Sequence, residues 1–145
     1  MFRALLKFFQ SAVSPSAIIV DAAKAQDTTD AAVIGCDARG TIVYWNDQAA
    51  TLFGWPSTDA VGRSLLDVLP THNGESEPVS IVDELRRGTP WRGQFVVRAR
   101  DGTPIVTFIS NTPVTAGKRV VGVVSVSRRE RRRSSRGSGE SRRAD

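Results

Sequence analysis

The side chains that most often carry chemistry are scarce in this chain. It has 145 residues with one cysteine, Cys36, and one histidine, His72. A single thiol cannot form an internal disulfide, and one Cys with one His cannot supply the ligands of a Cys/His zinc site. A lone thiol fits the reducing conditions of the cytoplasm, where we expect the protein to act.

The acidic residues are not arranged for acid–base catalysis either. Asp59, Asp67, Asp83 and Glu84 fall on segments with helical patterns, whose polar faces should meet water. The sequence also has no phosphate-binding glycine-rich loop and no convincing Ser/His/Asp set. We therefore expect a protein that is not an enzyme and that holds no metal.

The basic residues gather at the C-terminal end. The chain carries 20 Lys and Arg against 15 Asp and Glu, a net charge of +5. Residues 128–145 contain eight arginines and three acidic residues, also a net +5, so residues 1–127 are neutral. We expect residues 129–145 to be a disordered basic tail, which could attract nucleic acid or an acidic partner.

Residues 1–27 are expected to form an N-terminal helical extension. Within 2–13, apolar side chains recur at a helical spacing on one face: Phe2, Leu5, Leu6, Phe9 and Val13. We expect this amphipathic helix to pack on its own domain or on a copy of itself, which would give a homodimer, with attachment to a membrane surface as the alternative. Residues 14–16 should end it, and 17–25 should form a second short helix. No apolar run is long enough to span a membrane.

Two strands and a capped helix follow. Residues 31–36 and 41–45 have β-like composition, and the "DARG" between them has the Asp and Gly preferences of a type I turn. Asn46 is placed to cap a helix over residues 47–53, because its side-chain oxygen can accept from the free N–H groups of the first turn. Gly54 can supply the left-handed residue that ends this helix.

The rest of the chain alternates helical turns with strands. Two short helical turns are expected within 55–70, and a clearer helix over 80–88. Strands are expected at 91–100, 103–114 and 119–127, joined by tight turns that include Asp101-Gly102. The sequence therefore predicts an α+β domain, with a five-stranded antiparallel sheet and short helices over one face.

The ordered motifs resemble a known family. "DARGTIVYWNDQAATLFGW", "VGRSLLDVLP", "WRGQF" and "DGTP" follow one another as in PAS domains. The resemblance covers residues 28–128. It implies a sensory module that binds a small molecule, a chromophore or a protein partner, and that relays a change through a dimer or partner, with regulation of transcription as one expected output. The alternative is a nucleic-acid-associated regulator that uses the Arg-rich tail, with the PAS-like fold as dimeriser.

The cofactors that the family implies are not matched by this sequence. Flavin photosensors of the family use a Cys within a helical motif, whereas Cys36 lies on a predicted strand. Haem-binding members use an axial His near the helix before the third strand, whereas His72 lies in a polar loop. Haem and flavin are both disfavoured, and the cofactor, if one exists, is unknown.

What remains is an apolar cleft between the sheet and the helices. Its lining would suit a hydrophobic or aromatic ligand. We expect the cleft to be lined by Val43, Trp45, Leu52, Phe53, Leu69, Ile81, Leu85, Phe95, Phe108 and Val123.

Overall fold

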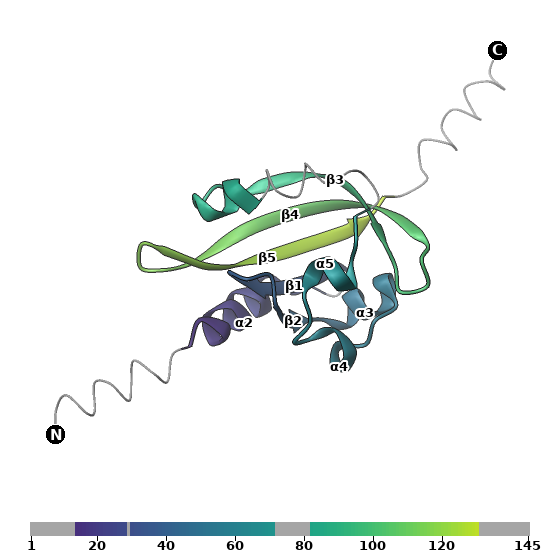
Figure 1. Ribbon diagram of the computed structural model, residues 1–145, viewed down its shortest axis with the longest axis horizontal. Helices are drawn as coiled ribbons and strands as arrows, with labels where there is room; N and C mark the ends of the chain where they lie inside the picture. Colours follow the sequence, from purple (N-terminus) through teal and green to yellow (C-terminus); the bar gives the residue numbers. More distant parts are fainter. Residues whose placement is uncertain (1–13, 29, 72–81, 131–145) are drawn as a thin grey trace, which may run out of the picture.

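Five strands and several short helices make up the computed structural model, which describes residues 14–28, 30–71 and 82–130 (Figure 1). In chain order the elements are α2 (Pro15–Gln26), β1 (Ala32–Asp37), β2 (Ile42–Trp45), α3 (Asp47–Phe53), α4 (Ser57–Ala60), α5 (Leu65–Val68), β3 (Trp91–Arg98), β4 (Pro104–Ala116) and β5 (Arg119–Arg129). Residues 82–86 are also helical. The predicted helix over 2–13 and the predicted tail lie outside the described residues.

The strands form one antiparallel sheet in the order β2-β1-β5-β4-β3. Tight turns join β1 to β2, β3 to β4 and β4 to β5, whereas the helices are inserted between β2 and β3. The first and last strands of the chain therefore meet at the centre, where Ile34 lies opposite Ser125 and Cys36 opposite Val123. This confirms the predicted α+β fold with a five-stranded antiparallel sheet.

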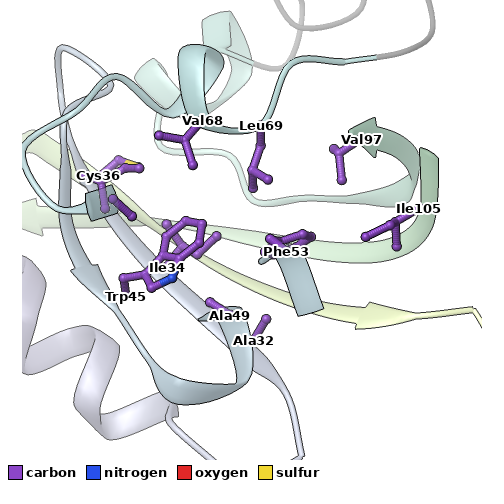
Figure 2. Close-up of a cluster of buried hydrophobic side chains, with 12 residues drawn as sticks. Ala32, Ile34, Cys36, Trp45, Ala49, Phe53, Val68, Leu69, Val97 and Ile105 are labelled. Carbon is purple, nitrogen blue, oxygen red and sulfur yellow. The ribbon is translucent and has the colours of Figure 1, made fainter. Parts of the chain in front are cut away.

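The face of the sheet that meets α3 and α5, called the front face below, carries the larger core. Strand side chains such as Ile34 and Ile105 pack there against Phe53 of α3 and against Val68 and Leu69 of the α5 region (Figure 2). Alternation along each strand directs every second side chain to this face. The predicted cover of helices is thus present on the front face.

The back face is partly covered by α2, which contacts β1, β5, β2 and β4. Ser14 caps this helix, and two of the helix's own side chains, Ile19 and Ala23, are fully buried against the sheet. Ile19 rests above two glycines of neighbouring strands: a Cβ on Gly35 would lie 2.9 Å from Ile19 Cγ2, and a Cβ on Gly122 would collide with Ile19 and with the Cys36 carbonyl oxygen. The absence of side chains at both positions lets α2 approach the sheet closely.

A tryptophan clamp fastens the helices to the β3–β4 turn. The Trp55 ring has the Arg100 guanidinium 4.2 Å and the Arg63 guanidinium 5.6 Å from its centroid. Arg100 also pairs with Asp59 at 2.8 Å and donates its backbone N–H to the Phe53 carbonyl at 2.9 Å. These contacts join the loop after α3, helix α4 and the β3–β4 turn at one end of the domain.

Candidate ligand-binding site

Asn46 joins three elements around the site. Its Oδ1 accepts from the Ala49 N–H, which caps α3, and from the Val33 N–H of β1, both at 2.9 Å. Its Nδ2 donates to Asp27 Oδ1 at 2.7 Å and to the Ala31 carbonyl at 2.9 Å. The predicted cap is confirmed, and the same side chain also ties α3 to β1 and to the residue that follows α2.

A cavity of about 840 Å³ lies between the front of the sheet and the helices. This volume falls in the range of ~300–1,000 Å³ that is usual for small-molecule sites. Apolar side chains form its floor and roof: Ile34, Phe95, Val97, Ile109 and Val123 from the strands, and Phe53, Leu65, Leu66, Leu69, Val82 and Leu85 from the helical segments. The arrangement can hold a largely apolar molecule.

A few polar groups lie on the sheet side of this cavity. Ser125 Oγ donates to Asn111 Oδ1 across β4 and β5, and Ser127 follows two residues later on the same face. Ser125 and Ser127 are buried, and Asn111 is partly buried. Sparse, fixed polar groups in an apolar cavity orient a ligand more than they hold it.

The Cys36 thiol lines the cavity but is poorly suited to react. Its side chain is 1% exposed on β1. Burial, with a smaller contribution from the Asp37 charge, raises the pKa of the thiol to about 12. The nucleophilic thiolate is therefore scarce near neutral pH. Within the described ranges, no group of three or more His, Cys, Asp or Glu side chains could hold a metal ion.

A family model for the PAS fold matches residues 21–129. The chain belongs to the PAS family. The match covers the sheet, the helical layer, the cavity and the second half of α2. The resemblance read from the sequence is thereby confirmed.

Solved structures share the fold of this PAS domain at low sequence identity. The PAS domain of a protein from Colwellia psychrerythraea is 22% identical with a TM-score of 0.66, over 78% of this chain and 97% of that one. The light-state dimer of the fungal blue-light photoreceptor Vivid is 17% identical with a TM-score of 0.59, over 70% and 78%. An RNA-binding Light-Oxygen-Voltage receptor is 18% identical with a TM-score of 0.63, over 72% of this chain and 31% of its own.

A comparison with curated proteins gave no match. Among the described residues of the PAS domain, no helix has the length and apolar character needed to cross a membrane.

The PAS cavity brings together several of the residues that were predicted to line it. Phe53 from α3, Leu69 after α5, Leu85 from the helical residues 82–86, Phe95 from β3 and Val123 from β5 all lie on its wall. They come from five separate parts of the chain. The fold alone assembles them.

Other predicted lining residues lie elsewhere. Val43 packs on the back face against α2, because its strand alternates and Ile42 faces the front instead. Phe108 also points to the back, where it is 55% exposed. Trp45 and Leu52 pack within or against the front core without reaching the cavity wall. These four residues therefore lie off the cavity wall, whereas Ile81 and His72 lie outside the described residues.

Sequence reasoning missed the polar groups on the sheet side of the cavity and several of its apolar lining residues. Ile109 and Asn111 share the front face of β4 with Ile105, whereas the predicted lining residue Phe108 belongs to the other face. The alternation of serine with valine at the end of β5 was the available signal, because Ser125 and Ser127 occupy the same inward face.

Proposed function

We propose that this PAS domain is a cytoplasmic sensor that binds a small, mostly apolar ligand in the cavity and relays occupancy to a dimer or protein partner. It works by binding and not by catalysis. The cavity between the sheet and the helices, about 840 Å³ and mainly apolar, is the observation that carries the proposal. A domain built only for packing would fill such a volume with its own side chains.

Two connections support a relay from the cavity to α2. Ile34 and Cys36 line the cavity from β1, and Gly35 between them lies under Ile19 of α2. Asn46 caps α3, whose last residue Phe53 lines the cavity, and it also bonds to Asp27 at the end of α2. A ligand that shifts β1 or α3 therefore acts on α2 through both faces of the sheet.

The first experiment combines native mass spectrometry with an absorbance spectrum of the purified protein. We expect a co-purifying small molecule, which Ile109→Trp should exclude because the indole would occupy the cavity. Phe108→Trp is the matched control, because Phe108 is next to Ile109 in the sequence but its side chain points away from the cavity and is exposed. A ligand retained by Ile109→Trp, or an empty wild-type protein that takes up no apolar compound, would contradict the proposal.

The relay has its own readout in hydrogen exchange. Ligand binding should slow amide exchange in α2 as well as in the strands that line the cavity. Unchanged exchange in α2 with protection confined to the cavity wall would mean that the site binds without signalling through this helix.

The second candidate function is a nucleic-acid-associated regulator that uses the Arg-rich tail, with the PAS fold as dimeriser. The charge distribution favours this function, because the net charge of residues 128–145, +5, is the same as that of the whole chain. One neighbour that shares the fold is an RNA-binding receptor. Deleting residues 129–145 should then abolish salt-dependent binding to nucleic acid, whereas the cavity sensor should bind its ligand unchanged.

A further inference from the structure

We propose that the ligand is an amphipathic organic acid, with a long apolar body inside the cavity and a single carboxylate at its mouth. The inference rests on the proposed function and adds the chemical class of the ligand. It comes from the placement of charge around the cavity. Apolar walls alone would not distinguish an acid from a neutral molecule.

The basic residues of the cavity wall come from three separate parts of the chain. Arg39 belongs to the β1–β2 turn and Arg86 to the helical residues 82–86, while Lys118 lies in the β4–β5 turn and Arg119 begins β5. The helical residues 82–86 and the β4–β5 turn lie at the same end of the sheet in Figure 1. Asp37 lies beside Gly122 in the β1–β5 pairing, which brings the β1–β2 turn to that end too. We call this end the mouth.

The mouth has more positive than negative charge. Two carboxylates, Asp37 and Asp83, accompany the four basic side chains. Asp37 already accepts from the backbone N–H groups of Arg39 at 2.9 Å and Thr41 at 3.0 Å. None of the four cations forms an ion pair with any residue that the structure describes. Charge of one sign collected around a low-dielectric opening favours a ligand of the opposite sign.

The cavity is elongated, and its wall is charged at one end and neutral at the other. Ser127 lies eight residues along β5 from Arg119, a span of roughly 26 Å at the usual rise of a strand. Among the described residues of the wall, every charged one belongs to the mouth, whereas the far part is formed by neutral residues such as Val97, Phe53 and Ser127. A molecule charged at one end and apolar along the rest matches this gradient.

Two exposed apolar side chains also line the cavity. Leu66 of α5 is 59% exposed and Val82 is 43% exposed, although both belong to the cavity wall. Both side chains expose apolar surface to water, and an apolar chain that enters the cavity would bury this surface. A compact polar anion would gain nothing from these side chains, so a small di- or tricarboxylate fits less well than a long-chain acid.

The test uses three probes with the same ten-carbon chain: decanoate, decan-1-ol and decyltrimethylammonium. Binding to the full-length protein is followed by calorimetry and by the fluorescence of Trp91, whose ring centroid lies 5.5 Å from that of the cavity residue Phe95. We expect decanoate to bind about tenfold more tightly than the alcohol, with the ammonium weakest. Because the cations are exposed, added salt should weaken decanoate binding and leave the alcohol unaffected.

A matched pair of variants separates the mouth from general charge. Lys118→Gln/Arg119→Gln should lower the affinity for decanoate by about tenfold and leave that for decan-1-ol unchanged. Lys24→Gln/Arg129→Gln removes the same charge from exposed positions outside the cavity wall and should change neither. Circular dichroism confirms that each variant is folded.

The possible failures are distinguishable. Equal binding of all three probes, or equal loss of decanoate in both double variants, overturns the organic-acid assignment and leaves the cavity sensor intact. Failure of all three probes to bind, with Ile109→Trp indistinguishable from wild type, overturns both the assignment and the proposed function.

Discussion

Tyr44 is the single tyrosine of the chain, so its ionisation can be followed without interference. Its hydroxyl donates to Asp27 at the end of α2. Burial, this hydrogen bond and the nearby charges of Asp27 and Asp47 raise the pKa of the phenol from 10.0 to about 12. The native state therefore holds the Tyr44 proton more tightly than the unfolded chain does.

We expect the phenolate absorbance of the folded protein to appear near pH 12. The stabilisation from the raised Tyr44 pKa is fully present below pH 10, the unfolded value, and is lost as the pH rises to about 12. Asp27→Asn removes a carboxylate charge, so the midpoint should fall but stay above 10 because burial remains. A midpoint at 10 while tryptophan fluorescence still reports the folded state would contradict this account.

Single residues also show how far sequence reasoning reaches. The capping role of Asn46 was predictable, because it depends on Ala49 three residues away and on Gly54 at the helix end. Its bonds to Val33 and Asp27 were not predictable, since they depend on how distant segments are packed together. Local chemistry is encoded locally, whereas a joint between elements exists only in the folded chain.

Among the elements, α2 depends on two glycines that hold it close to the sheet. Gly122→Ala should destabilise the fold by about 1–3 kcal/mol, because the added methyl group would collide with the Cys36 carbonyl oxygen and with Ile19. Urea unfolding followed by tryptophan fluorescence measures the loss. Hydrogen exchange should increase more in α2 than in α3.

Thr115→Ala on β4 is the control for this substitution. Thr115 is exposed, so its change should stay within about 0.5 kcal/mol of wild type. If Gly122→Ala proved as stable as the control, α2 would not be held by close approach to β5.

The strands were predictable as elements, but which face of each strand the helices cover was not. Alternation divides β4 into two sets of side chains and does not say which set lies inside. Phe108 was predicted to line the cleft, yet it lies on the back face, where it is 55% exposed, and Ile109 lines the cavity instead. The sheet and its helical cover follow from period and turn signals, whereas the detailed wall of the site depends on packing.

At the scale of the whole molecule, the prediction concerns association between two copies of the chain. We expect a homodimer assembled through the amphipathic pattern of residues 2–13. Leu5→Glu/Phe9→Glu should then give a monomer by light scattering on a sizing column, because two charges would interrupt the apolar face. Lys7→Glu/Gln10→Glu changes the polar face of the same segment and should leave the dimer intact.

The alternative contact would be the part of the back face around Phe108, which is 55% exposed. If Leu5→Glu/Phe9→Glu remained dimeric while Phe108→Glu became monomeric, association would run through β4 and the N-terminal segment would be excluded as the dimer contact. Vivid, which shares the fold, has been captured as a dimer.

The helical layer is fastened to the sheet at two places. At one end Trp55, Arg100 and Asp59 tie it to the β3–β4 turn. Near the β1–β2 turn, the Leu65 N–H donates to the Gly40 carbonyl oxygen and the Ile42 N–H donates to the Arg63 carbonyl oxygen, both at 2.9 Å. Because both attachments would have to break before α4 and α5 could lift, we expect a ligand to enter beside the helical residues 82–86 and to leave the spacing between α5 and β2 unchanged.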